Sequence, residues 1–296
     1  VLAAYNTTMT RVNGVYEKDA AITMKLIADT DKLIFLNQST DPFTNGNGDA
    51  MLNQNQQAID SRIGLSNYDI GHVFSTGGGG IASLRSPCTN NKAKGVTGSA
   101  TPVGDPFDID YVAHEMGHQF GANHTQNNNC NRNSSTAIEP GSGSTIMGYA
   151  GICSPDVQNN SDGHFHGISI SEIANFVVAG NGNSCPVKTV IDNQKPEVSV
   201  KKSSYTIPLS TAFYLTALGQ DADGDNLTYC WEQINNETAS MPPKPTNVNG
   251  PSFRSNPPSS SPTRYFPDLQ RRYNTWEVLP SVARTMNFRC TVRDNN

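Results

Sequence analysis

Three histidines and one glutamate between positions 114 and 124 have the types and spacing of a metal-dependent hydrolytic site. The segment reads His-Glu-Met-Gly-His-Gln-Phe-Gly-Ala-Asn-His. A helix would place His114 and His118 on one face, one turn apart, so that both imidazoles reach one ion. Gly121 would end that helix, because glycine adopts the left-handed conformation at little cost. The chain could then bring His124 to the same ion.

Three imidazoles predict zinc with an open fourth position, which is typical of catalytic and not of structural zinc sites. Zinc lowers the pKa of a bound water to about 7, and Glu115 could accept the proton. The predicted chemistry is attack of the resulting hydroxide on a peptide carbonyl. Two alternatives are an accidental match to the pattern and a degenerate site that binds zinc without turnover. The presence of Glu115 argues against the degenerate site.

A second segment, downstream of the histidines, supports the first. Residues 144–150 read Ser-Thr-Ile-Met-Gly-Tyr-Ala and place Met147 23 positions after His124 (147 minus 124). With this segment the chain resembles the metzincin clan of zinc peptidases, whose members carry a methionine-containing tight turn beneath the metal. It resembles most closely the reprolysin-like, adamalysin-type enzymes, including secreted bacterial members, over roughly residues 1–187. The resemblance implies that His114, His118 and His124 bind zinc.

Two residues depart from the adamalysin-type pattern. Thr125 follows the third histidine, where these enzymes usually have aspartate. Tyr149 lies two positions after the methionine, as in astacin-like, serralysin-like and pappalysin-like enzymes. Pappalysins also often have threonine after the third histidine, so a pappalysin-like peptidase is the alternative subfamily. Tyr149 has two candidate roles: a contact with the metal or with the developing oxyanion, or packing beneath the site.

The pattern of elements predicts an α/β or α+β domain. The resemblance implies that residues 1–187 form a metzincin catalytic domain with a twisted mixed sheet and an active-site helix. Apolar residues that step by three and four from Leu2 to Tyr16 predict a first helix. Metzincins open with a strand, so the first strand of this domain is expected to be missing or to lie on a separate fragment. Further expectations are strands at 21–27, 33–36 and 68–75, a helix capped by Asp49, an active-site helix capped by Asp108 or Asp110, and a capping box of Ser169 and Glu172.

The glycine-rich stretch before Ile81 predicts a turn into an edge strand, with the return strand beginning at 95–98. An open sheet edge offers unpaired N–H and C=O groups to an extended peptide. We therefore expect substrate to bind along four residues of this edge: Ile81, Ala82, Ser83 and Leu84.

The composition changes after Cys185. Residues 188–296 are rich in Pro, Ser and Thr with short alternating runs, which predicts an all-β immunoglobulin-like sandwich. Residues 227–231 and 288–294 resemble paired strands of the PKD-like or fibronectin-like modules of secreted bacterial enzymes. A last strand is expected to be missing, so the module is expected to be truncated. A turn in it carries three carboxylates, which are either Ca²⁺ ligands or a solvated acidic turn: Asp221, Asp223 and Asp225.

Six cysteines, none in a C-x-x-C pair, favour disulfides and an oxidising compartment. Cys230 and Cys290 both fall in the C-terminal part and are expected to pair. Of the other four, Cys130 and Cys153 would bridge the segment between the third histidine and the loop after Met147. The resemblance to adamalysin-type enzymes implies the remaining pair, Cys88 with Cys185.

Composition excludes several classes of function. A net charge of −5 without long charge runs gives no basic footprint for nucleic acid. No apolar run approaches the 18 or more residues of a membrane helix, and no signal peptide is present. We expect a secreted, extracellular monomer whose partners are protein or peptide substrates. The alternative from another class is a vestigial peptidase that acts as an adhesin, with the β-sandwich as its binding module.

Overall fold

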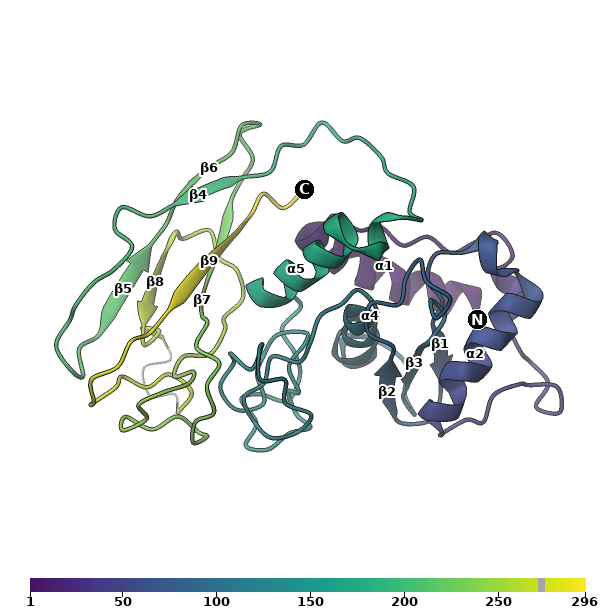
Figure 1. Ribbon diagram of the computed structural model, residues 1–296, viewed down its shortest axis with the longest axis horizontal. Coiled ribbons are helices and arrows are strands. Elements are labelled where there is room, and N and C mark those ends of the chain that lie inside the picture. The colour runs from purple at the N-terminus through teal and green to yellow at the C-terminus, as the bar shows by residue number, and fades with distance from the viewer. Residues whose placement is uncertain (271–274) are drawn as a thin grey trace. The chain divides into compact units, whose positions relative to one another are not determined.

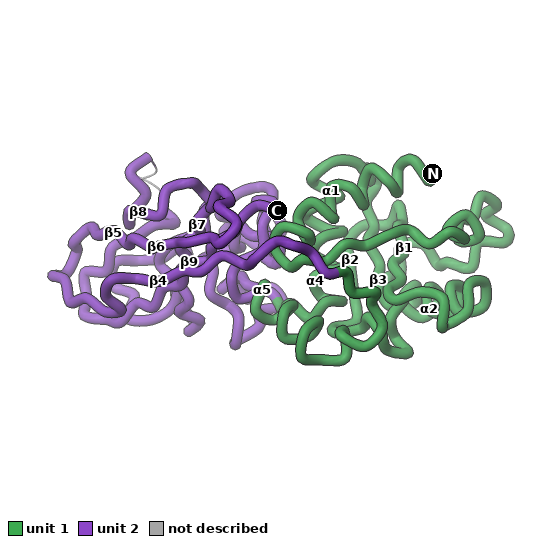
Figure 2. The backbone as a smooth tube through the Cα atoms, turned by 90° about the horizontal axis from the view of Figure 1, so that it is seen from above, with its two compact units in different colours: residues 1–123, 170–189 green, residues 124–169, 190–296 purple. Residues whose placement is uncertain are grey.

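The computed structural model describes residues 1–270 and 275–296, which form two compact units. The first unit contains residues 1–123 and 170–189, and the second contains residues 124–169 and 190–296 (Figure 2). None of the helices in these described ranges is long and apolar enough to cross a membrane.

The first unit combines helices with a small mixed sheet, as the predicted α/β class requires (Figure 1). The sheet has the order β1-β3-β2, with β1 parallel and β2 antiparallel to β3. The expected edge strand and its return are therefore confirmed as neighbours in the sheet. Its strands are β1 (Val73–Ser75), β2 (Gly79–Ala82) and β3 (Gly95–Gly98).

The helices before the metal-binding segment are α1 (Leu2–Ala20), α2 (Gly48–Arg62) and α3 (Asp105–Phe107). A π-helical stretch, Asp108–Ala113, continues α3 into α4 (His114–Gln119). The last helix, α5 (Gly167–Ala174), ends in a π-helical stretch, Asn175–Ala179, close to the predicted end at Gly180. Short 3-10 turns are Thr30–Leu33, Leu65–Asn67 and Asn181–Asn183.

Helix α1 buries the stripe that its apolar spacing predicts. Met9, Val12 and Tyr16 are buried, whereas Leu2 at the start of the helix is 41% exposed. The Tyr16 hydroxyl donates a hydrogen bond to the Ala113 carbonyl at 2.8 Å. This bond ties α1 to the residue that directly precedes the first histidine of the metal-binding pattern.

The strands predicted at 21–27 and 33–36 are not formed. Both backbone polar groups of Met24 are hydrogen-bonded to the side chain of Asn13. Met24 N donates to Asn13 Oδ1 at 2.9 Å, and Asn13 Nδ2 donates to Met24 O at 2.8 Å, so a side chain replaces a strand partner. The strand predicted at 68–75 is shorter than expected. Before Val73, the backbone pairs with a loop instead, through Cys88 N to Asp69 O at 3.1 Å and Gly71 N to Lys92 O at 2.8 Å.

Three predicted helix caps are wrong. Asn47, and not Asp49, caps α2, because its side chain accepts from Ala50 N at 3.0 Å. Asp108 and Asp110 lie inside the continuous helical stretch from α3 to α4 and cap nothing. Ser169 and Glu172 do not form the predicted capping box at the start of the last helix, because both residues lie inside α5.

The second unit forms three antiparallel pairs of strands, β4–β6, β5–β8 and β7–β9. The predicted pairing of 227–231 with 288–294 is confirmed by β7 and β9. Ala217, Trp231, Phe253 and Phe266 form the centre of their core. The complete immunoglobulin-like sandwich stays a prediction. The strands are β4 (Glu197–Ser199), β5 (Phe213–Thr216), β6 (Leu218–Gln220), β7 (Thr228–Gln233), β8 (Thr263–Phe266) and β9 (Phe288–Arg293).

Two of the three expected disulfides form, Cys88–Cys185 and Cys130–Cys153. The expected pair of Cys230 with Cys290 is wrong, since both are free thiols in the described part of the chain. The register explains the error. Cys230 lies opposite Thr291, and Cys290 lies opposite Trp231. Directly opposed residues share a face and neighbours along a strand alternate, so the two thiols lie on opposite faces of the ladder.

Candidate metal centre

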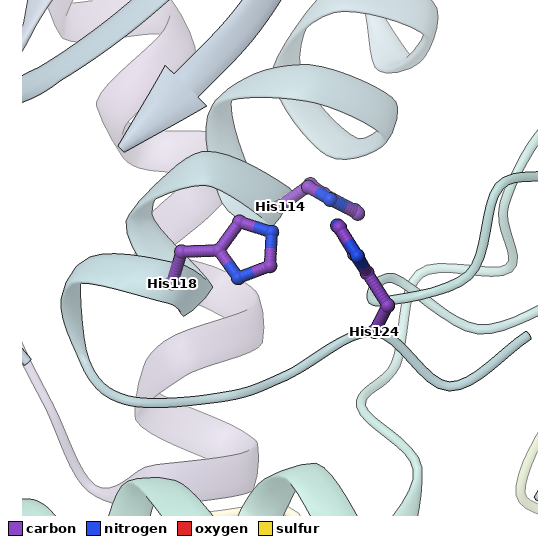
Figure 3. Close-up of side chains that lie close together, drawn as sticks. All are labelled: His114, His118 and His124. Carbon is purple, nitrogen blue, oxygen red and sulfur yellow. The ribbon is translucent and has the colours of Figure 1, made fainter. Parts of the chain in front are cut away.

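Helix α4 and the turn after it bring the three histidines together (Figure 3). The rings of His114 and His118 lie 4.8 Å apart, centroid to centroid, at 85° to one another. One potential ligand atom from each of these residues and from His124 lies within 4.8 Å of the others, so the three could hold a metal ion. The convergence that the spacing predicts is therefore present.

Backbone carbonyls orient two of the imidazoles. His118 Nδ1 lies 2.7 Å from the Ala122 carbonyl, and His124 Nδ1 lies 2.8 Å from the Asn131 carbonyl. A carbonyl only accepts, so in each ring Nδ1 carries the proton and Nε2 carries the lone pair that a metal requires. Burial lowers the pKa of His124, which favours the neutral, ligating form.

The chain reverses between the second and third histidines through a turn that a distant residue supports. Gly121 adopts a φ of +104°, the left-handed conformation expected after the helix. Glu172 accepts hydrogen bonds from Asn123 N at 2.8 Å and from Asn123 Nδ2 at 2.6 Å. Glu172 thus anchors the residue before His124 and has no capping role. No spacing in the sequence links positions 123 and 172, so this contact had no local signal.

Glu115 provides a buried carboxylate beside the histidines. It is 6% exposed, and its Oε2 has no hydrogen-bond partner among the described residues. Burial raises the pKa of Glu115 to about 8. A cation held by the histidines would favour the ionised carboxylate and lower that pKa again. The converging imidazoles and the carboxyl oxygen without a partner among the described residues therefore fit a divalent cation, and three nitrogen ligands suit zinc.

The edge strand β2 passes directly against Glu115. A Cβ atom built on Gly80 would lie 2.3 Å from Glu115 Oε1 and 2.5 Å from its Cγ. Only a residue without a side chain leaves room for the carboxylate there. Ile81 and Ala82 continue β2 past this point. The other two predicted substrate-binding residues, Ser83 and Leu84, follow the end of the strand.

Met147 is fully buried in a tight turn, closed by a hydrogen bond from Gly148 N to Thr145 O at 2.9 Å. Its carbonyl accepts from Thr125 N at 3.1 Å. The ring of Tyr149 lies 4.5 Å from the ring of His124, centroid to centroid, and its hydroxyl accepts from Asn131 Nδ2 at 3.1 Å. The phenol therefore lies beside the third histidine.

A buried acid that the sequence analysis did not select, Glu139, organises this turn. It is 1% exposed and accepts from the hydroxyls of Thr125 at 2.6 Å and Thr145 at 2.5 Å. It also accepts from the backbone N–H groups of Ser144 at 2.8 Å and Thr145 at 3.2 Å. The threonine that replaces the usual aspartate after the third histidine is thus a donor to this carboxylate. The only sequence signal was an isolated acid in an uncharged, Gly- and Ser-rich stretch.

Two further clusters do not provide a metal site of comparable quality. Asp221, Asp223 and Asp225 place ligand atoms within 4.8 Å of one another. Asp221 Oδ1 accepts from the backbone N–H groups of Asp223 and Asp225 at 2.9 and 3.1 Å, as a turn without an ion would require. Calcium binding there gains no support and stays a prediction.

The second cluster consists of His164, Cys230 and Glu232, which also place ligand atoms within 4.8 Å of one another. Ser255 Oγ lies among these side chains. It is 3.3 Å from His164 Nε2, 3.9 Å from Cys230 Sγ and 2.7 Å from Glu232 Oε1. A serine hydroxyl occupies the centre of this cluster, which is therefore a hydrogen-bonded network.

Comparisons with known proteins agree with the geometry of the histidine cluster. A search of curated proteins gave no significant match. Residues 2–125 match the family described as "Metallo-peptidase family M12B Reprolysin-like", so that the match spans α1, the sheet and all three histidines and ends one residue after the last of them. These residues of the chain form a reprolysin-like metallopeptidase domain of family M12B.

Proposed function

We propose that the protein is a secreted, zinc-dependent endopeptidase that hydrolyses peptide bonds of extracellular proteins. One observation carries the proposal: three converging imidazoles lie beside a buried, unpartnered carboxylate on a helix that matches a metallopeptidase family. The two disulfides are compatible with an extracellular location.

In this function His114, His118 and His124 hold zinc through Nε2 of at least the two rings whose Nδ1 is bonded to a carbonyl. When bound, zinc supplies Lewis acidity, which activates a water and polarises the scissile carbonyl. Glu115 accepts the proton of the attacking water. Its buried position keeps the carboxylate poorly solvated and therefore basic. Tyr149, whose ring lies beside that of the third histidine, would donate a hydrogen bond to the oxygen on which negative charge develops.

Substrate would bind as an extended strand along Ile81, Ala82, Ser83 and Leu84. Strand β2 is at the edge of its sheet, so its outer N–H and C=O groups can pair with a peptide. Because Gly80 lies against Glu115, a peptide paired with the following residues would pass next to the carboxylate. The structure of a peptide-inhibitor complex tests this directly. Backbone hydrogen bonds to 81–84 are expected, and their absence would refute the binding mode.

The test of the catalytic role is Glu115→Gln. The glutamine keeps the shape of the side chain but accepts no proton, so turnover should fall by about 10² to 10⁴ while zinc content is unchanged. A variant with near wild-type turnover would remove Glu115 from the mechanism. The same experiment separates the peptidase from the vestigial, adhesin-like alternative, in which Glu115 has no role. A pappalysin-like subfamily would share this chemistry and differ in substrate preference.

A further inference from the structure

One face of the β7–β9 ladder is both polar and buried. Trp231 points from β7 into the aromatic core, so its neighbours Cys230 and Glu232 point to the other face. Glu232 lies opposite Arg289 of β9, which shares that face. Glu232 is 1% exposed. Arg293, which lies four residues after Arg289 on β9 and shares the same face, is 4% exposed. Charged side chains on a two-stranded ladder normally face water, so this face must be covered.

The cover is residues 164–167, which we call the covering segment. Glu232 Oε2 accepts a hydrogen bond from Gly167 N at 2.8 Å, and Arg289 Nη1 donates to Gly167 O at 2.9 Å. The opposed pair Glu232 and Arg289 thus holds both backbone groups of one residue. A Cβ on Gly167 would lie 2.6 Å from Thr291 Oγ1, which shows how closely the segment approaches the ladder.

The contact is electrostatic as well as steric. Burial alone would raise the pKa of Glu232, but the neighbouring His166 and His164 side chains and hydrogen bonds from Ser255 and Gly167 lower it below its ordinary value. Its Oε2 lies 3.5 Å from His166 Nδ1. Glu232 is therefore a carboxylate, and loss of one partner from such a buried, charged contact is strongly destabilising.

The covering segment and the ladder reach the methionine turn through short links. The His164 carbonyl accepts from Ile146 N at 3.2 Å. Ser144 Oγ donates at 3.1 Å to the carbonyl of Ser255, whose hydroxyl is bonded to Glu232. Residues 144–146 directly precede Met147, so two hydrogen bonds along each route separate the carboxylate of Glu232 from the turn.

We infer that the β7–β9 ladder is the scaffold of the active-site loop, with Glu232 as the positioning residue that fixes residues 144–167. The C-terminal strands are then an integral part of the peptidase and not an independent binding module. Only the expected effect on turnover rests on the proposed function; the structural part stands on the contacts of this unit.

Hydrogen exchange in the 296-residue chain tests the structural part. Protection of the Ile146 and Gly167 amides should be lost at the same denaturant concentration as protection of β7 and β9, because loop and ladder open together. Loss of protection at Ile146 and Gly167 while β7 and β9 stay protected would overturn the inference. This result does not depend on peptidase activity.

A pair of variants tests the positioning role. Glu232→Gln removes the charge, and Glu277→Gln is the matched control, because Glu277 is also a buried carboxylate but is bonded to Arg264 at 2.6 Å and to Asp268 N. In folded Glu232→Gln, exchange at Ile146 and Gly167 should be at least about tenfold faster, as expected for a lost charged hydrogen bond.

Turnover of Glu232→Gln should fall by a similar factor, whereas the control should keep wild-type turnover at the same temperature and should raise exchange at Ile146 and Gly167 no more than exchange in β7 and β9. Equal behaviour of the two variants would refute the role of Glu232. If Glu232→Gln does not fold, Arg289→Met removes the hydrogen bond to the Gly167 carbonyl and should lower turnover by about fivefold. No change would again refute the scaffold. A wild-type chain without activity would refute the proposed function alone.

Discussion

Gly80 gives a sharp test of the site, because it lies outside the catalytic residues yet controls the space around one of them. In Gly80→Ala the new Cβ would lie 2.3 Å from Glu115 Oε1. Real Cβ contacts essentially never fall below 3.0 Å, so the carboxylate or the strand must move by at least 0.7 Å (3.0 minus 2.3). A misplacement of about 1 Å at a reacting group costs on the order of 10²-fold in rate. We therefore expect turnover to fall by about 10²-fold.

The neighbouring Gly78 is the matched control. A Cβ there meets nothing within 4 Å, so Gly78→Ala should keep turnover within about twofold of wild type, well below the effect of a misplaced group. Turnover is measured on a quenched fluorescent peptide, with zinc content and thermal midpoint recorded for each variant. Both should stay at wild-type levels in Gly80→Ala.

A double variant identifies the cause of the loss. If Gly80→Ala acts by displacing the carboxylate, it should cost little more once Glu115 is already glutamine, because effects on one shared group are not additive. Gly80→Ala with turnover within threefold of wild type, far above the expected loss, would refute the contact between β2 and the general base.

Four further outcomes are expected. Tyr149→Phe should lower kcat by about 10² to 10³ with little change in KM, since an oxyanion contact forms only as charge develops; a change within about threefold would leave Tyr149 as packing alone. Glu139→Gln should lower the free energy of unfolding by about 2–4 kcal/mol in denaturant titrations, because donors in the methionine turn lose their acceptor; a loss below about 0.5 kcal/mol, the size of an ordinary surface substitution, would contradict its role. Burial lowers the pKa of His72 from 6.5 to about 4, so between these pH values the unfolded chain binds a proton that the native chain does not. The free energy of unfolding should therefore fall as the pH drops from 6.5 towards 4. His72→Gln should lose this part of the pH dependence, and a variant with the same pH profile as wild type would contradict the assignment. Cys230 and Cys290 should give two titratable thiols per chain after denaturation without reductant, and none would show that they pair after all.

The chemistry of the site could be predicted from the sequence because it is encoded locally. Helical geometry alone places His114, Glu115 and His118 together, and one glycine redirects the chain to His124. The methionine turn has a similarly compact signature around Met147. In each case the residues that act together lie within a few positions, so spacing carries the information.

The supports of the site could not be predicted in this way. Glu139, Glu172 and Glu232 hold the third-histidine segment and the methionine turn through contacts that span 14, 49 and 65 residues. Each of these carboxylates accepts from at least one backbone N–H group, and such a partner leaves no trace in residue type. A capping-box pattern even suggested another role for Glu172, because tertiary contacts override a local preference.

The free thiols illustrate a second limit. Pairing of β7 with β9 follows from their alternating apolar residues, but a shift of one residue changes the face of every side chain. Cys230 and Cys290 are offset by that single residue, which composition and spacing do not reveal. The absent strand at 21–27 shows that side chains also mislead, since the Asn13 side chain satisfies the backbone of Met24 without a neighbouring strand.

The central claim is that the three-histidine cluster holds the zinc of a peptidase, and one measurement tests it most directly. The purified 296-residue chain is assayed on casein after stringent removal of zinc and again after stoichiometric zinc is restored, with His124→Ala in parallel. Cleavage should disappear on removal, return with zinc, and stay absent in the variant, which should bind zinc more weakly while remaining folded. Cleavage that persists in the zinc-free protein, or full zinc occupancy with wild-type activity in His124→Ala, would contradict the account.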